Sequence, residues 1–241
     1  MTRVVISQPM FFPWVGFFEQ LQLADRYVIY DTAAFSKGSF TNRVQIPVVG
    51  ETCKWLTLPL VKFPLGTPIQ SLQLRPEVEW MPRHQAFLEQ VYQKAPFKKD
   101  MLALVQEVYA QSTAFAMPLI LKSMQVVCDY YDLAFQPLYA SELLLETVAD
   151  KSGKVLQMVQ ACKGTVYITG SGALNYLDHQ RFEEQQIQVR YMDYAKKAYP
   201  QLTTDTFNPY VSILDLIANV GPEGKAFFAP KTIDWKMIDA S

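Results

Sequence analysis

Polar side chains that could bind and transform an anionic ligand follow a strand-like run near the start of the chain. Asp31 ends the run "RYVIYD", and Lys37, Asn42 and Arg43 lie in the loop after it. This mixture of carboxylate, ammonium, amide and guanidinium groups suits a sugar phosphate. We predict that Asp31, Lys37 and Arg43 are catalytic, with Asp31 as the base, and Asn42 is predicted to bind the ligand. The alternative is structural: Asp31 caps a turn and pairs with Arg43.

A second group of residues lies in the opening segment "VVISQPMFFPWVGFF". Gln8 follows its apolar strand-like part, and Trp14 and Gly16 stand where a helix begins. Trp14 offers a flat face to a base or sugar, and Gly16 permits close backbone approach. We predict that Gln8, Trp14 and Gly16 bind a ligand. The alternative is an aromatic staple that seats the helix on a sheet.

The segment "TGSGALNYLD" repeats the order of strand, glycine turn and short helix. Gly170, Ser171 and Gly172 could form a backbone nest for a phosphate or carboxylate. We predict that these three residues and Tyr176 bind the ligand. A plain tight turn capped by Ser171 is the alternative.

Composition excludes several classes of function. Lys and Arg total 22 against 23 Asp and Glu, so no global field favours a nucleic-acid partner. The 3 cysteines form no CxxC pair, which argues against a disulfide framework or a structural zinc site. The start of the chain lacks a signal-peptide cleavage site, and no apolar run reaches the roughly 18 residues that span a bilayer. We therefore expect a cytoplasmic protein with no membrane insertion.

Histidine content limits the chemistry further. Only His84 and His179 are present, which excludes His-rich zinc sites and predicts no metal site. Both are expected to be structural or solvated, so an enzyme would depend on carboxylate, Lys, Tyr or substrate positioning. The sequence leaves the cofactor unknown, and a small-molecule substrate, such as a sugar nucleotide, is the expected partner. The oligomeric state stays open, a homo-oligomer included.

The order of elements predicts an α/β fold with a mostly parallel sheet flanked by helices. Residues 3–31 read as strand, helix and strand, the opening of a βαβ unit. Residues 32–78, rich in proline, predict a small β excursion, and residues 80–135 a helical segment. We predict one α/β domain over residues 1–241. The opening also resembles that of HxGH nucleotidyltransferases with both histidines missing, which favours a nucleotide-shaped pocket but not adenylyl transfer.

Several motifs together resemble the WbqC-like protein family of bacteria. They are, in chain order, "QPMFFPWVGFF", "ADRYVIYDTAAFSKGSFTNRVQI", "WLTLPL", "VYQKAPF", "VYITGSGALNYL", "YPQ" and "SILDLIANVG". The matching positions are Gln8, Pro9, Pro13, Trp14, Gly16, Asp25, Asp31, Lys37, Asn42, Arg43, Trp55, Tyr92, Gly170, Tyr176, Tyr199, Gln201, Asp215 and Gly221. The chain departs from the family at "YAKKA" and "QLTTDTF", where the family often has histidine.

The resemblance implies a function in biosynthesis. Family members occur among genes for O-antigen, a part of lipopolysaccharide, and other surface polysaccharides, and among specialised-metabolite genes. It implies a cytosolic transferase that modifies a sugar nucleotide or amino sugar by acyl or aminoacyl transfer. The alternative is a non-catalytic ligand-binding or assembly component of the same pathway.

Overall fold

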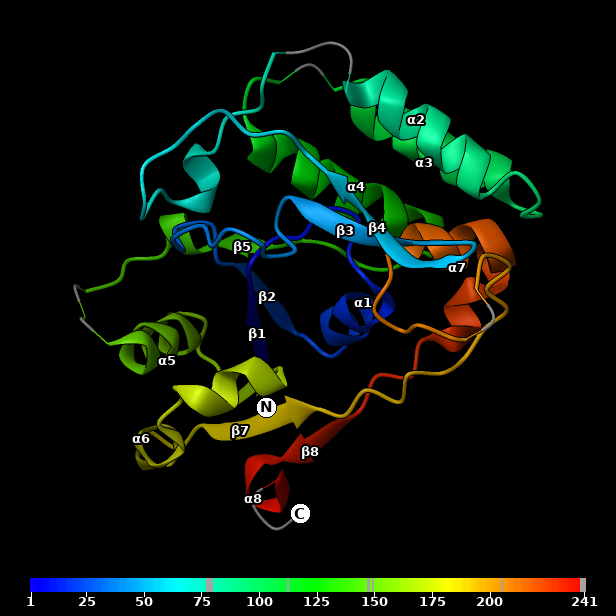
Figure 1. Ribbon diagram of the computed structural model, residues 1–241. Coiled ribbons are helices and arrows are strands. Elements are labelled where there is room, and N and C mark those ends of the chain that lie inside the picture. Colours follow the sequence, from blue (N-terminus) through cyan, green and yellow to red (C-terminus); the bar gives the residue numbers. More distant parts are fainter. Residues whose placement is uncertain (77–79, 112, 147, 149, 205, 239–241) are drawn as a thin grey trace.

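A six-stranded sheet with the strand order β5-β2-β1-β6-β7-β8 runs through the protein (Figure 1). The computed structural model describes residues 1–76, 80–111, 113–146, 148, 150–204 and 206–238. The strands of the sheet are β1 (Arg3–Ser7), β2 (Arg26–Ile29), β5 (Leu138–Tyr139), β6 (Val166–Thr169), β7 (Gln188–Met192) and β8 (Thr232–Asp234). All neighbouring pairs are parallel except β7 with β8. The predicted mostly parallel α/β sheet is confirmed.

The opening βαβ unit forms as the sequence predicted. Helix α1 (Val15–Gln22) connects β1 to β2, and Val5 pairs in register with Tyr27. Parallel neighbours need such a crossover, because a tight hairpin can join only antiparallel strands. Strand β1 also pairs with β6 on its other side, so it lies inside the sheet.

Both faces of the sheet are buried, and successive residues of β1 serve opposite faces. Val5 packs into one core with α1, whereas Val4 and Ile6 pack into a second core with α5 (Lys151–Ala161) and α6 (His179–Glu184). This alternation follows from the two-residue period of a strand. It explains why the strands read as continuous apolar runs.

The β excursion and the helical segment cover one side of the sheet. The excursion is an antiparallel hairpin of β3 (Arg43–Val48) and β4 (Glu51–Thr57). The other helices are α2 (Trp80–Val91), α3 (Lys98–Tyr109), α4 (Ala116–Tyr130), α7 (Ile213–Val220) and α8 (Trp235–Ile238), with 3₁₀ turns at Ile69–Ser71, Ala140–Glu142, Ser171–Asn175 and Gly221–Phe227. Pro118 is accommodated in the first turn of α4, where its missing N–H breaks no helical bond.

The loop between β1 and α1 has an unusual backbone that is anchored from several sides. Phe12 is fully buried and has a φ of 40°, which is rare for a bulky residue. Its N–H donates to Ser123 Oγ on α4 at 3.0 Å, and its carbonyl accepts from Ser212 Oγ at 2.9 Å. The neighbouring groups are also paired, since the Phe11 N–H donates to the Thr41 carbonyl. These bonds hold the loop in one conformation.

A buried carboxylate lies at the centre of the C-terminal part of the fold. Asp215 on α7 is completely buried, and its Oδ2 accepts from Tyr199 Oη at 2.8 Å and from Gln201 Nε2 at 3.0 Å. Asn219 Nδ2 donates to the other oxygen at 3.2 Å. Burial raises the pKa of Asp215 to about 6, against the effect of these donors.

The raised pKa of Asp215 predicts a pH-dependent stability. A raised native pKa stabilises the fold fully below the unfolded value of 3.8, and that contribution is lost as the pH rises through about 6. Two pKa units correspond to about 3 kcal/mol. Relative to Asp215→Asn, wild type should therefore lose about 2 kcal/mol of unfolding free energy between pH 4.5 and 7.5, measured by urea unfolding, because about 1.5 of these units lie in that window. A difference that does not vary with pH would contradict this.

Removing one anchor of the loop should destabilise the protein. Ser123→Ala leaves the Phe12 N–H buried without its acceptor, which should lower the unfolding free energy by about 1–3 kcal/mol. Ser171→Ala changes an exposed serine and is the matched control, expected to have no measurable effect. Chemical denaturation followed by circular dichroism compares the two, and equal stability of both variants would argue against the anchor.

Candidate functional site

A large pocket lies at the point where the strand order reverses. The chain leaves β1 for β2 on one side and later returns to β6 on the other, so the carboxyl ends of β1 and β6 frame a topological switch point. A pocket of about 680 Å³ opens there. Ser7, Tyr30 and Thr169, at the ends of three strands, line it. We call it the switch-point pocket, and its volume suits a small-molecule ligand.

Two lysines give the switch-point pocket a cationic side. Lys151 and Lys154 line it from the first turn of α5 and lie three residues apart, hence on the same face of the helix. Asp150 caps this helix, and its carboxylate accepts from the Gly153 N–H at 2.6 Å. The positive end of the helix dipole and two ammonium groups favour an anion here.

The remaining walls are aromatic rings and uncharged polar groups. Trp14, Tyr30, Tyr176 and Tyr194 contribute rings. Burial raises the pKa of the Tyr176 and Tyr194 hydroxyls, so both are protonated at neutral pH and can donate hydrogen bonds. Gln20 also lines the pocket, although its side chain is only 7% exposed. Among the described lining residues there is no Asp, Glu or His.

The structure brings five of the residues predicted to bind a ligand together at this pocket. They are Gln8, Trp14, Gly170, Gly172 and Tyr176.

Three of the five come from the glycine turn after β6 and two from the loop after β1. Ser171 is exposed and does not line the pocket. The glycine turn therefore supplies backbone and Tyr176, but not the Ser171 hydroxyl.

Gly16 has a different role from the predicted close approach to a ligand. A Cβ at this position would overlap the indole ring of Trp14 and lie 2.6 Å from Tyr194. The glycine therefore lets the Trp14 ring fold back over the start of α1, where it packs against the Tyr194 ring at a tilt of 54° with the ring centroids 4.7 Å apart. Gly16 shapes the site by seating Trp14.

The residues predicted to be catalytic lie elsewhere and have other partners. Asp31 is 3% exposed and accepts hydrogen bonds from the backbone and hydroxyl of Ser141. The Arg43 guanidinium lies 3.9 Å over the Trp55 ring. Lys37 is exposed, and none of Asp31, Lys37 and Arg43 lines either of the two pockets described.

Asn42 is also used structurally. Its Nδ2 donates to the Leu58 carbonyl at 2.9 Å across the base of the β3–β4 hairpin. Arg43 Nη2 likewise donates to the Gly38 carbonyl at 2.7 Å. Asn42 and Arg43 thus stabilise the hairpin and the loop before it. Asp31 and Arg43 bind different partners instead of each other.

Four residues that line the switch-point pocket were not predicted from the sequence: Lys151, Lys154, Gln20 and Tyr194. The segment "DKSGK" opens α5, and its two lysines one turn apart after a cap are a signal for an anion site. Gln20 and Tyr194 carried no local signal, since their position depends on how α1 packs against the segment after β7.

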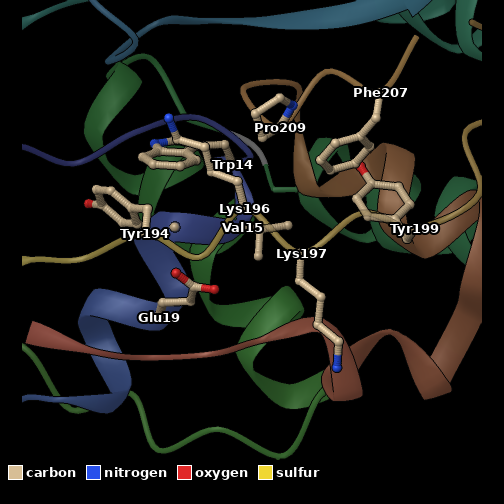
Figure 2. Close-up of a pocket in the computed structure, with 10 residues that line it drawn as sticks. Trp14, Val15, Glu19, Tyr194, Lys196, Lys197, Tyr199, Phe207 and Pro209 are labelled. Carbon is tan, nitrogen blue, oxygen red and sulfur yellow. The ribbon is translucent and has the colours of Figure 1, made fainter.

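A second, much smaller pocket lies behind Trp14 and Tyr194 (Figure 2). It has about 10 Å³ of free space, and Trp14 and Tyr194 line both pockets. Its other lining residues are Val15, Gly16, Glu19, Lys196, Lys197, Tyr199, Phe207 and Pro209. The Trp14–Tyr194 pair therefore forms a wall between the two pockets.

Both histidines have structural partners. His84 Nδ1 lies 2.8 Å from Tyr109 Oη, and burial lowers the pKa of His84 to about 4. His179 Nε2 lies 2.8 Å from Tyr191 Oη, and its ring stacks on Trp235. Neither lines a described pocket.

No group of His, Cys, Asp and Glu in the described part of the chain could hold a metal ion. None of the described helices is long and apolar enough to cross a bilayer.

One comparison with known proteins identifies a family. The model of the WbqC-like protein family matches residues 8–227. A protein of Mycobacterium tuberculosis (strain ATCC 25618 / H37Rv), named "Uncharacterized protein Rv1507c", is 29% identical over 226 residues, which cover 92% of this chain and 96% of that protein. No solved structure matches the chain. The family match includes the loop after β1, the glycine turn after β6 and α7, so the chain belongs to the WbqC-like protein family.

Proposed function

We propose that this protein is a transferase that modifies a sugar nucleotide or amino sugar by acyl or aminoacyl transfer. The observation that supports it most is the switch-point pocket, which combines a cationic side with aromatic and amide walls. A sugar nucleotide offers matching groups: phosphates for the lysines, a flat base for an aromatic ring, and hydroxyls for the amides. The reaction would belong to surface-polysaccharide or related biosynthesis in the cytoplasm, as the family resemblance implies.

Each part of the pocket has a role in this proposal. Lys151 and Lys154 hold the phosphates, and Trp14 stacks on the base or the sugar. Gln8 and Gln20 supply amide donors and acceptors for sugar hydroxyls. The amine of the sugar attacks the carbonyl of an acyl thioester, so the C–N bond forms as the C–S bond breaks, and the thiolate leaves and takes up the proton that the amine loses. The protein contributes mainly by holding the two reactants in line.

One observation favours a second candidate, a non-catalytic binding or assembly component of the same pathway. No carboxylate or imidazole is found among the described residues that line the switch-point pocket. No carboxylate or imidazole base of the described residues is therefore in contact with a ligand there. The binding component and the transferase share the same pocket and differ in whether product forms.

Removal of the two lysines should weaken binding. The double variant Lys151→Ala/Lys154→Ala should bind a uridine diphosphate amino sugar at least about tenfold more weakly than wild type in calorimetry, because two phosphate contacts are lost. Lys99→Ala removes an exposed lysine on α3 and is the control, with unchanged affinity expected. Equal affinity of all three proteins would remove the assignment of the pocket.

Activity separates the two candidates. Incubation with nucleotide-linked amino sugars and acyl or aminoacyl thioesters, followed by mass spectrometry, should yield an N-acylated sugar from wild type and from Arg43→Ala, since Arg43 lies outside the pocket. Binding without product under every donor would favour the binding component. A selective loss of turnover in Arg43→Ala or Asp31→Asn would instead restore the site predicted from the sequence.

The role of Gly16 can be tested independently. Gly16→Ala should displace the Trp14 ring, shift its indole N–H resonance and weaken nucleotide-sugar binding by about tenfold, while the protein stays folded. Gly172→Ala is the control for the resonance, because a Cβ there meets no atom within 4 Å. An unchanged Trp14 resonance in Gly16→Ala would show that the ring does not need the glycine.

A further inference from the structure

Glu19 is an acidic residue that the fold buries without a cation. It lies on α1, is 2% exposed and lines the small pocket behind Trp14. Its Oε1 accepts from the Ala229 N–H at 3.0 Å. Among the residues that the structure describes, its Oε2 has no hydrogen-bond donor, and Glu19 forms no ion pair. The Oε2 atom of Glu19 is therefore available to a group bound in the small pocket.

The two lysines of the small pocket are engaged elsewhere. Lys197 Nζ donates to the Ala226 carbonyl at 2.8 Å, and Lys196 Nζ lies 5.2 Å over the Tyr210 ring. Figure 2 shows the Lys197 side chain extending away from the aromatic rings. Neither lysine compensates the charge of Glu19.

An uncompensated buried carboxylate is costly. Transfer of a carboxylate out of water without a partner is unfavourable, which is why buried charges in proteins are paired or bind a ligand. Burial accordingly raises the pKa of Glu19. A cationic group in the pocket would supply the missing partner.

The space beside Glu19 limits the size and kind of that group. About 10 Å³ is room for one group of the size of water, and a primary ammonium is of this size. Trp14 and Tyr194 present rings to both pockets, with their centroids 4.7 Å apart. Aromatic rings beside a carboxylate are a recurring environment for an ammonium cation, because the ring faces carry partial negative charge.

We infer that the small pocket is an ammonium subsite, in which the carboxylate of Glu19 and the rings of Trp14 and Tyr194 bind the primary amine of a ligand. The subsite deepens the proposed function and rests on it only for the molecule that carries the amine, an aminoacyl donor, whose amine is not the nucleophile. Its position behind the wall of the switch-point pocket places the amine next to a bound sugar nucleotide.

The test uses methylammonium alone, so that its result does not depend on any nucleotide sugar. Methylammonium chloride is titrated into ¹⁵N-labelled protein against sodium chloride at equal ionic strength. The Gly16 and Ala229 amides and the Trp14 indole N–H should shift and saturate with methylammonium and not with sodium. Wild type without saturable, ammonium-specific shifts would overturn the inference, even if it bound a sugar nucleotide normally.

Variants of Glu19 identify the binding group. Glu19→Gln keeps the acceptor for Ala229 and removes the charge, and should weaken methylammonium binding at least about tenfold. Glu184→Gln, which changes an exposed glutamate, is the control and should bind as wild type. Equal binding by Glu19→Gln and wild type would overturn the inference. If Glu19→Gln does not fold, Trp14→Leu serves instead: weaker binding supports the aromatic subsite, and unchanged binding overturns it.

Discussion

The strained backbone of Phe12 is the constraint on which the candidate site depends. A left-handed conformation at a buried phenylalanine costs about 1–3 kcal/mol and persists only where the surroundings impose it. Ser123 and Ser212 impose it from two helices that are distant in sequence. Ser212 also accepts from the Leu214 N–H and so caps α7, which couples the start of that helix to the loop. These hydrogen bonds therefore hold Trp14, at the end of this loop, in one orientation beyond the end of β1.

This placement makes Trp14 the wall between two environments of opposite charge. On one side lie the ammonium groups of Lys151 and Lys154 at the positive end of α5, and on the other lies the buried carboxylate of Glu19. Gly16 is what allows the indole ring to lie over the helix at all. The arrangement suits an anionic group on one side of the indole ring and an amine on the other. A sugar nucleotide with an aminoacyl partner fits that description.

Local signals in the sequence predict the order of elements, whereas they do not predict the neighbours of each polar side chain. The strand–helix–strand order of residues 3–31 is such a local signal, and it recurs in the structure. Gln8, Trp14 and Gly170 line the switch-point pocket because strand ends converge at the switch point of any parallel sheet. Arg43 lines neither pocket, because a guanidinium can bind a carbonyl and a ring as readily as a phosphate, and only tertiary structure decides. Lys151 and Glu19 were not predicted, because helix-surface charges look solvated until neighbours bury or border them.

The most direct test of the account is the structure of the protein crystallised with a uridine diphosphate amino sugar. If the switch-point pocket binds the ligand, the diphosphate should lie within hydrogen-bond distance of Lys151 or Lys154. Trp14 should contact the ligand with its ring, and Asp31 should still be bound to Ser141. A ligand bound instead against Arg43 and Lys37, with the switch-point pocket empty, would contradict the account.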